Sequence, residues 1–422
     1  MQSTSRADEI AHAVISQFNR LSSKRKPSIR DNGACEWIPL AGIVAEQNEV
    51  FTCLSLATGM KCLPAARLPS AAGNVLHDWH AEILAIRAFN RLVLDECRSL
   101  SQDQDLATDL LVFTPSPRDD TPPFRIRPGV KLHMYCSEAP CGDASMELVM
   151  AAQPDASPWD EPSPDSSSSS SASPLPGRGH FSRLGIVRRK PSRADAPPSA
   201  SKSCSDKLAL KQCTSLLSSL TSLLVQPSNA YIHTLILPVS QHVPAACERA
   251  FASTGRMNPV AASAATAADD GASCWTDGYV FRSFVVETTS ERFCFSREVR
   301  TAASPSIVPC NLAVAWSAGS VEEPIVNGIL HGRKPLDPGS ASRLSRRRMW
   351  EAAAAVADAL RLRDAEPAPQ IYKHLNEPKY HHVKNGSLLT ARKAMKAEVR
   401  QKALAGWVAN QADSDFGRDV TA

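Results

Sequence analysis

The stretch 75–92, "VLHDWHAEILAIRAFNRL", predicts a buried helix that begins with an unusual pair of polar side chains. Apolar residues recur at helical spacing along it: Ile83, Leu84, Ile86, Phe89 and Leu92. The polar pair is His80 and Glu82, two positions apart. Side chains at i and i+2 of a regular helix point away from each other, so both can be aimed at one spot only in the first turn. This sequence therefore predicts either an ordinary polar helix start or part of a metal site.

Segments rich in β-branched and apolar residues surround this helix and predict an α/β fold. The strands expected around it are 36–46, 50–63, 109–114 and 131–137, and a helix is expected at 140–152. This β-β-α-β-β-α order predicts an α/β layer sandwich. Farther along we expect a helix at 205–224, strands at 230–239, 279–289, 311–316 and 323–333, and basic helices at 340–362 and 387–408.

Composition limits the class of protein. The 422 residues, 43% of them hydrophobic, can fill the core of one large domain. Lys and Arg exceed Asp and Glu only by 47 to 43, so a nucleic-acid surface would need local clustering. Residues 1–34 carry no signal-peptide core, and Ile10, Val14, Phe18 and Leu21 instead predict an amphipathic helix. No stretch approaches the ~18 apolar residues of a membrane span. We expect an intracellular, soluble protein, nuclear or cytoplasmic, with mostly reduced cysteines.

Residues 153–203 interrupt the predicted domain at 35–416, and residues 417–422 form a short tail. The first half is rich in Pro and Ser, with a six-serine run, and cannot bury enough apolar area to order itself. The second half is basic, with Arg178, Arg183, Arg188, Arg189, Lys190 and Arg193. By composition alone, this basic half is either a solvated linker or a functional surface.

Cysteines at two later helix starts extend the metal hypothesis. Zinc deaminases combine H-x-E with P-C-x-x-C, in which Glu is not a ligand. Here Pro140-Cys141 gives only one thiolate, because Ala144 stands where the second cysteine would be. Cys204 is the best remaining candidate, since a helix start and nearby Lys207 lower a thiol pKa. A capping histidine and a buried structural thiol remain the alternative.

The trio "HAE", "PCGD" and "SCSDK", in this order, resembles the family of adenosine deaminases that act on RNA. The resemblance covers about residues 35–416 and implies a cytidine-deaminase-like three-layer α/β/α sandwich with a C-terminal helical extension. It also implies that His80, Cys141 and Cys204 bind one catalytic Zn²⁺ and that Glu82 shuttles protons. Asp78 resembles a residue that links Lys207 to the zinc environment, although it could simply cap the helix.

Within the family, "HDWHAEILAIR" and "SCSDKLALKQ" look like the fungal tRNA-specific form, and no duplex-RNA-binding module precedes the domain. The resemblance implies hydrolytic deamination of adenosine 37 of alanine tRNA to inosine. An anticodon-loop base is already single-stranded, so taking it out of the stack costs little. The basic residues Arg188, Arg189, Lys190 and Arg193 are the expected RNA contacts.

The family also buries an inositol hexakisphosphate beneath the active site, and many matching positions are present. They are Lys61, Arg87, Lys207, Arg346, Tyr380, Lys384, Lys396, Trp407 and Asp415. Buried cations without a counter-charge are costly, which agrees with a bound polyanion. Ile86, Leu210, Lys211, His77 and Arg392 depart from the family pattern. The alternative is that these basic residues only decorate amphipathic helices.

Two other functions remain open. One is an editor of other RNAs, and the other is a catalytically inert, zinc-containing RNA-binding subunit. Glu82 argues against the second, because a structural zinc site has no use for a carboxylate that is not a ligand. No obligate protein partner is evident from the sequence.

Overall fold

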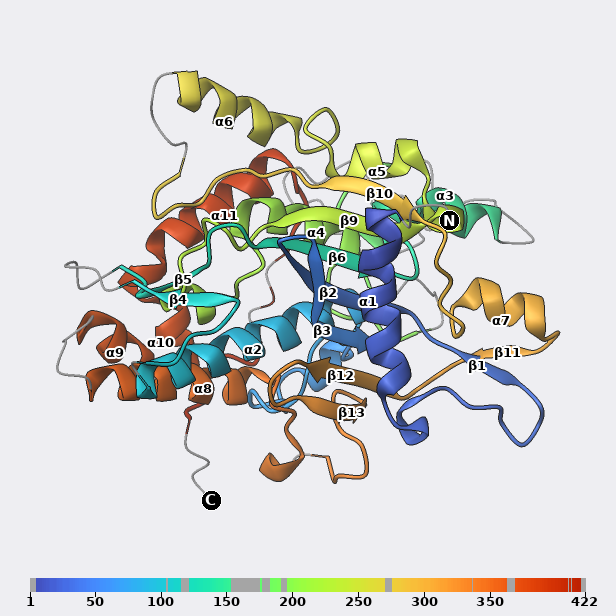
Figure 1. The fold of residues 1–422 in the computed structure, drawn as a ribbon, viewed down its shortest axis with the longest axis horizontal. Coiled ribbons are helices and arrows are strands. Elements are labelled where there is room, and N and C mark those ends of the chain that lie inside the picture. The colour runs from blue at the N-terminus through green and yellow to red at the C-terminus, as the bar shows by residue number, and fades with distance from the viewer. Residues whose placement is uncertain are drawn as a thin grey trace, which may run out of the picture.

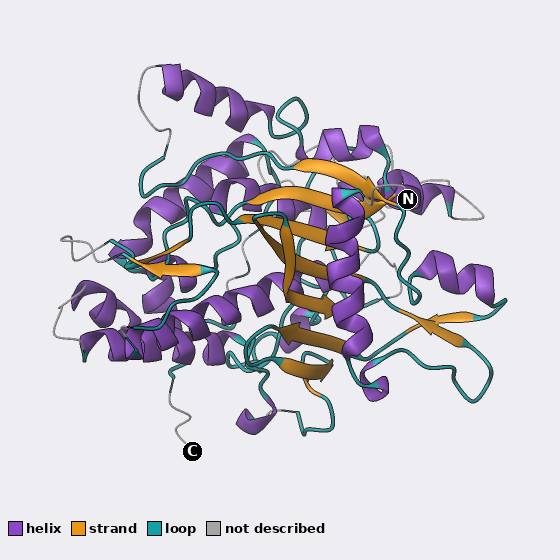
Figure 2. Ribbon diagram, in the orientation of Figure 1, coloured by secondary structure: helices purple, strands orange, loops and turns teal. Residues whose placement is uncertain are grey.

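The computed structural model describes residues 5–103, 105–114, 121–152, 175–176, 183–190, 196–269, 275–335, 337–362, 369–408, 410 and 412–418. At its centre lies a mixed eight-stranded sheet, in the order β10-β9-β6-β2-β3-β12-β13-β14 (Figures 1 and 2). These strands are β2 Leu40–Gln47, β3 Val50–Thr58, β6 Lys131–Cys136, β9 Ile232–Pro238, β10 Val285–Thr289, β12 Ala313–Ser317, β13 Glu322–Val326 and β14 Ile329–Leu330. The β6–β9 and β9–β10 pairs are parallel, and the others are antiparallel.

Alternating residues of the central strands feed two separate hydrophobic cores. In β2, Ala41 and Ile43 lie in the larger core, whereas Leu40 and Val44 lie in the smaller one. Successive side chains of a strand point to opposite faces, so both faces of the sheet are covered. The predicted three-layer α/β/α sandwich is confirmed.

Helix α1, Arg6–Arg20, covers the face with the smaller core and lies across the strands in Figure 1. Ile10, Val14 and Phe18 are fully buried there. The sequence predicts a helix within residues 1–34 but places it ahead of the domain. In the structure this helix is one layer of the sandwich, because its apolar stripe packs directly on the sheet.

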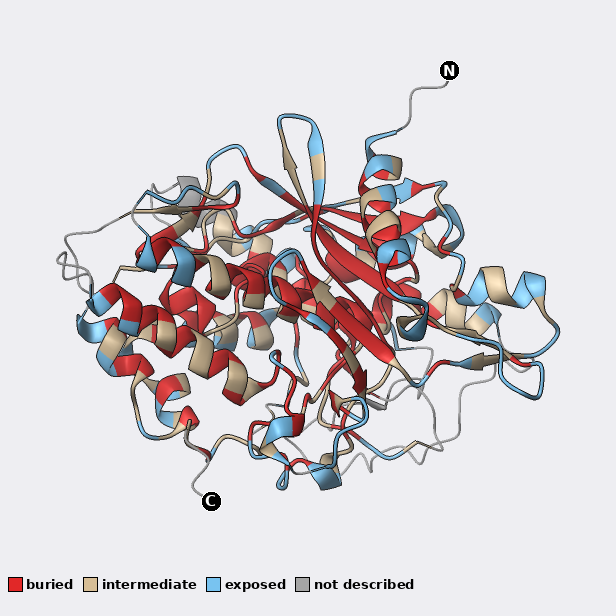
Figure 3. Ribbon diagram, turned by 60° about the horizontal axis from the view of Figure 1, so that its bottom comes forward, coloured by how far each residue is buried: buried red, intermediate tan, exposed pale blue. Residues whose placement is uncertain are grey.

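The larger core holds α2 Ala81–Gln102 and α4 Cys204–Thr214 together with the C-terminal helices. These are α8 Arg346–Arg361, α9 Pro369–Leu375, α10 Tyr380–Asn385 and α11 Thr390–Lys402, whose inner faces are buried in Figure 3. Trp350 of α8 is fully buried, and α8 packs against α2. The expected C-terminal helical extension is therefore present. No helix in the described ranges is long and apolar enough to cross a bilayer.

Several predicted elements differ in extent. The strand expected at 36–46 is divided into β1, Cys35–Trp37, and β2, and β1 pairs with β11, Ile307–Pro309. The strand expected at 109–114 becomes β4, Leu111–Phe113, which pairs with β5, Phe124–Ile126, outside the central sheet. The helix expected at 205–224 ends at Thr214, because Ser215 takes a positive φ of 57°. The remaining elements are α3 Met146–Ala151, α5 Pro244–Phe251, α6 Asn258–Asp269, α7 Arg297–Ala303, β7 Leu175–Pro176 and β8 Arg188–Arg189.

Candidate active site

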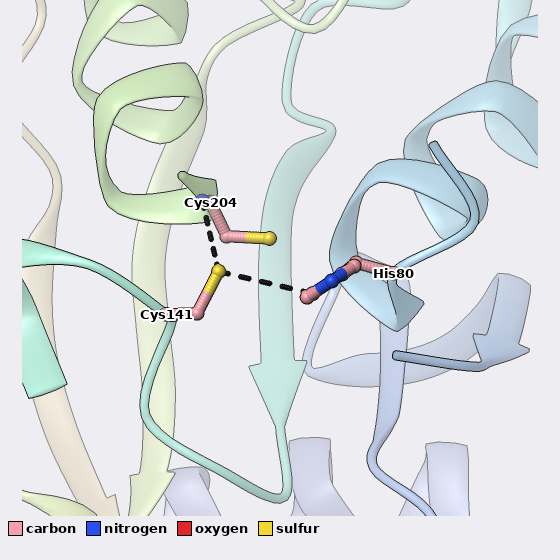
Figure 4. Close-up of side chains that lie close together, drawn as sticks. All are labelled: His80, Cys141 and Cys204. Carbon is pink, nitrogen blue, oxygen red and sulfur yellow. Dashed lines mark hydrogen bonds between the residues drawn. The ribbon is translucent and has the colours of Figure 1, made fainter. Parts of the chain in front are cut away.

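Three elements far apart in the sequence bring His80, Cys141 and Cys204 together (Figure 4). His80 occupies the N-cap position of α2 without a side-chain capping hydrogen bond, Cys141 lies in the loop after β6, and Cys204 is the first residue of α4. One ligand atom from each lies within 4.8 Å of the others. The Nδ1 atom of His80 is 3.8 Å from Sγ of Cys141, and the backbone N–H of Cys204 donates to that sulfur at 3.3 Å.

The backbone before α2 explains how His80 and Glu82 face one site. His80 has an extended conformation (φ −62°, ψ 144°), so its side chain departs from the helical direction that Glu82 follows. The N–H of His80 donates to the Asp78 carboxylate at 3.0 Å, and the N–H of Ala81 donates to the carbonyl of Gly59 at 2.9 Å. Gly59 cannot carry a side chain, since a Cβ would lie 2.1 Å from the carbonyl oxygen of Trp79.

The cysteine-bearing loop depends on a second glycine. Gly142 has φ +106°, and a Cβ there would lie 2.3 Å from Oγ of Ser203. This close approach lets the loop after Cys141 pack against the start of α4. Ser205 completes the contact by donating to the carbonyl of Pro140 at 2.9 Å and accepting from the N–H of Ala144 at 3.1 Å. Ala144, at the position where a second cysteine would complete the P-C-x-x-C pattern, is fully buried in this contact.

Two arginines of the segment after β9 hold the two cysteine-bearing turns in place. Arg249 donates to Asp143 Oδ1 at 3.1 Å and to its carbonyl at 2.9 Å, and also pairs with Glu147 at 2.7 Å. Arg256 pairs with Asp206 of α4 at 2.6 Å, with only 4% and 0% of the two side chains exposed. Sequence reasoning gave these arginines no role, because their partners lie about 50 and 106 residues away.

Asp78 is the centre of a buried ionic cluster beside the metal-ligand candidates. Lys190 donates to its two oxygens at 3.1 and 2.8 Å, and Lys207 and Ser201 also bond Oδ2. Burial alone would raise the pKa of the Asp78 carboxyl, but the charges of Lys190 and Lys207 lower it well below its usual value. Lys190 also lies 3.3 Å from Sγ of Cys204.

Glu82 lies in the first turn of α2 and is only 6% exposed. Burial, and then the charge of the Cys141 thiolate, raise the pKa of its carboxyl. No hydrogen bond from its side chain to another described residue is observed. A buried carboxyl beside a metal-ligand cluster, with its pKa raised, is suited to accept and return protons.

The donor set fits zinc. Two sulfurs and one imidazole nitrogen are ligands that Zn²⁺ prefers, and three protein ligands leave a fourth position for water, as in catalytic sites. The pKa of the Cys141 thiol is lowered well below its usual value by its hydrogen bond with Cys204, against desolvation, with help from Lys190 and His80. A thiolate is the form that binds a metal.

The residues expected to contact RNA differ in how far their side chains are exposed. Arg188 is fully buried and Lys190 is 4% exposed, so neither side chain offers its charge at the surface. Both side chains are covered because the chain around β8 runs under the surface to reach Asp78 and α4. Arg189 is half-buried, and Arg193 lies outside the described residues.

Most of the residues expected to hold a polyanion gather between α2, α4 and the C-terminal helices. Lys384 and Lys396 interact electrostatically with Lys211 and Arg392, two of the residues that depart from the family pattern. Burial, followed by these like charges, lowers the pKa of Lys384 and Lys211 well below the usual value and that of Lys396 to about 7.

The remaining expected positions have other partners. Arg87 donates to the carbonyl of Leu344 at 2.7 Å, and Tyr380 stacks on Phe416 with 4.9 Å between ring centres. Lys202 and Arg400 each make a cation–π contact with the Trp407 ring. Lys207 pairs with Asp78, and Lys61 donates to Asn311.

Asp415 is placed differently from the expectation. Its side chain is 76% exposed and pairs with Lys379 at 3.3 Å. The buried carboxylate next to the cluster is that of Asp413, which accepts from His77 at 2.7 Å and lies 3.8 Å from Arg346.

The chain is similar to known adenosine deaminases. The model of the adenosine-deaminase (editase) domain matches residues 55–411. The chain is 40% identical over 334 residues to a protein of Schizosaccharomyces pombe named tRNA-specific adenosine deaminase 1, covering 78% of this chain and 79% of that protein. The Saccharomyces cerevisiae protein of the same name is 34% identical over 228 residues, covering 50% and 54%.

A more distant relative is the double-stranded RNA-specific editase Adar of Drosophila melanogaster, 30% identical over 141 residues that cover 33% of this chain and 19% of that protein. The family match spans β3 to the segment after α11 and includes His80, Glu82, Cys141 and Cys204. The chain belongs to the adenosine-deaminase (editase) family.

Proposed function

We propose that this protein is a zinc-dependent hydrolase that converts adenosine to inosine in tRNA, at position 37 of alanine tRNA. The observation that carries the proposal is the buried Glu82 carboxyl beside the His80–Cys141–Cys204 cluster. A purely structural metal site would have no use for such a carboxyl. The tRNA substrate is supported by the printed names of the S. pombe and S. cerevisiae relatives.

His80, Cys141 and Cys204 would hold the zinc ion. When bound, Zn²⁺ supplies Lewis-acid activation of a water molecule at neutral pH. The protein's own contribution is the arrangement of the ligands: Asp78 orients the backbone at His80, and Lys190 lies against the sulfur of Cys204. Such surrounding contacts commonly tune metal affinity.

Glu82 would manage the protons of the reaction. Deamination adds water at C6 of adenine and releases ammonia, so a proton must leave the water and protons must reach N1 and the departing amino group. Because burial raises the pKa of Glu82, its carboxylate is a stronger base than an exposed glutamate and its acid form is populated closer to neutrality. One carboxyl can therefore take the proton and give it back.

The test of catalysis compares Glu82→Gln with wild type and with Glu96→Gln, a control on the same helix. We expect Glu82→Gln to retain its zinc and to lose at least about 100-fold in inosine formation, the usual scale of general acid–base catalysis. Zinc is measured by elemental analysis and inosine by sequencing for A-to-G changes. Equal activity of the two variants would refute the proton-shuttle role, and an inactive wild type that retained zinc would favour the RNA-binding subunit.

The test of substrate uses alanine tRNA, the same tRNA with guanosine at position 37, another tRNA and a duplex RNA hairpin. We expect inosine only in the alanine tRNA that carries adenosine at position 37, and only at that position. Efficient deamination of the hairpin would favour an editor of other RNAs. Among the basic residues of the insertion, Arg189 and Arg193 remain proposed RNA contacts.

We also propose inositol hexakisphosphate as a buried structural cofactor in the cation cluster. The support is the close approach of four cations, Lys211, Lys384, Lys396 and Arg392, because burial and these like charges lower the pKa of the three lysines. A polyanion removes that repulsion, whereas packing alone does not. Heat denaturation of the purified protein, followed by ion chromatography of the supernatant, should release about one inositol hexakisphosphate per chain. Its absence from a folded, active preparation would refute this proposal.

A further inference from the structure

A cavity lies between the segment that leads to His80 and the β13–β14 hairpin. It has a volume of about 140 Å³. Leu63, Val75 and Ile329 contribute apolar walls, whereas Arg67, His331 and Arg333 lie at its polar side. The two strands of this hairpin, β13 and β14, end the sheet, and β13 lies at its lower edge in Figure 1.

The two arginines at this cavity carry uncompensated charge. Arg67 and Arg333 are exposed, and neither side chain forms an ion pair or hydrogen bond with another residue in the described part of the chain. Two carboxylates of β13 are engaged elsewhere: Glu323 accepts from Ser342 and from the N–H of Arg343, and Glu322 lies 3.8 Å from Arg25. An apolar cavity with two free cations at its side suits a ligand that joins a ring to a phosphate.

The cavity is structurally coupled to the metal-ligand segment. The N–H of Leu63 donates to the carbonyl of His77 at 2.9 Å, and the N–H of Leu76 donates to that of Gly328 at 2.8 Å. Gly328 has φ +80°, and a Cβ there would lie 2.7 Å from the carbonyl oxygen of Leu76. The hairpin therefore packs tightly on the segment that leads to His80.

We propose that this cavity binds one unstacked nucleotide of the RNA substrate that flanks the target adenosine. Its base would enter the apolar cavity and its phosphates would contact Arg67 and Arg333. This inference rests on the proposed RNA deaminase function. A single-stranded loop is the fitting partner because only unpaired bases can be splayed out into a protein pocket. Protein cavities of ~150 Å³ admit a benzene ring, so the size suits one base ring.

The first experiment compares the double variant Arg67→Ala/Arg333→Ala with the double variant Arg98→Ala/Lys373→Ala. Both remove two exposed, unpaired cations, so they change net charge equally. The Kd and KM for an anticodon stem-loop are measured at several KCl concentrations. We expect the cavity variant to bind the stem-loop roughly tenfold more weakly than wild type. The slope of the logarithm of the association constant against the logarithm of the KCl concentration should be less steep by about 1.4, which is ~0.7 for each lost phosphate contact. Because neither arginine belongs to the metal cluster, kcat should change less than twofold.

The same data separate this inference from the proposed function. A wild type that neither binds nor deaminates RNA would overturn both. A wild type that deaminates RNA, with the cavity variant matching the control in Kd and salt slope, would overturn the cavity alone. If the cavity variant loses the AMP binding of wild type, measured by calorimetry, but keeps its Kd for RNA, the cavity binds a small phosphate ligand. That result would likewise overturn the cavity proposal.

The second experiment places an abasic residue at each position of the stem-loop in turn. If one base occupies the cavity, one abasic position should weaken binding to wild type several-fold but have no further effect on Arg67→Ala/Arg333→Ala. If the effect of the abasic residue adds to the effect of the two arginine substitutions at every position, the arginines act through diffuse electrostatics and the proposal is overturned.

Discussion

The Nζ atom of Lys190 lies 3.3 Å from Sγ of Cys204 and 2.8 Å from Oδ2 of Asp78, with the lysine buried. Burial and the neighbouring Cys141 raise the pKa of the Cys204 thiol, and the charge of Lys190 opposes this rise. The same amine links Cys204 to the aspartate that orients His80. Lys190 therefore connects two of the three metal-ligand candidates, although it lies within the insertion, directly after β8.

Replacing Lys190 by Met should weaken zinc binding by about 10- to 100-fold, the usual effect of losing a contact that supports a metal ligand. Competition with a chromogenic chelator measures the affinity. Arg189→Met, one residue away and half-buried, is the control and should change it less than twofold. Equal zinc affinity of Lys190→Met and wild type would contradict a supporting role for this amine.

Substitution of Gly142 by Ala should destabilise the site through a steric clash. Its Cβ would lie 2.3 Å from Ser203 Oγ, whereas a Cβ on Gly129, which has a similar positive φ of 86°, would have no heavy atom within 4 Å. Gly129→Ala therefore measures the backbone strain alone, of order 1 kcal/mol. We expect Gly142→Ala to lower the free energy of unfolding by roughly 2 kcal/mol more and to lower zinc content. Equal urea midpoints of the two variants would show that the loop relaxes freely.

Removal of Arg256 should leave the Asp206 carboxylate buried without its ionic partner. Breaking such a buried pair costs about 3–5 kcal/mol. Arg348→Met is the comparison, since Arg348 and Glu351 form a 2.8 Å pair with 38% and 31% of their side chains exposed, and surface pairs contribute at most about 1 kcal/mol. Urea unfolding followed by tryptophan fluorescence measures both. If Arg256→Met lowers the free energy of unfolding no more than Arg348→Met does, the buried pair with Asp206 does not stabilise the position of α4.

Stability in the absence of a polyanion should rise with pH because of the buried lysines. The pKa of Lys396 falls to about 7 in the folded protein, mainly through burial. Between pH 7 and about 10 the unfolded chain then binds more protons at this residue than the folded chain, so the free energy of unfolding increases with pH. Lys396→Met should reduce this slope. Added inositol hexakisphosphate should stabilise wild type most at the lower end of this pH range, since it favours the charged amines. An identical pH slope in wild type and Lys396→Met would contradict the depressed pKa.

Local sequence determined much of this protein. The helical period after Glu82 and the β-branched strands predicted the layers of the fold. The resemblance carried by the "HAE", "PCGD" and "SCSDK" segments implied that His80, Cys141 and Cys204 share one site, and the structure brings the three together. Such features can be read from the sequence because hydrophobic period and ligand chemistry are properties of neighbouring residues. The family comparison confirms the assignment that these segments predicted.

Only the tertiary structure decided the partners of charged residues distant in sequence. Lys190 and Arg188 resemble solvent-facing RNA contacts in the sequence because a basic run carries no sign of what will cover it, and the fold buries both against Asp78 and α4. Arg249 and Arg256 belong to no recognisable pattern, yet they hold both cysteine-bearing turns. Whether a charge binds solvent or a buried partner depends on which surface folding brings against it, and that is a property of the assembled layers rather than of any segment.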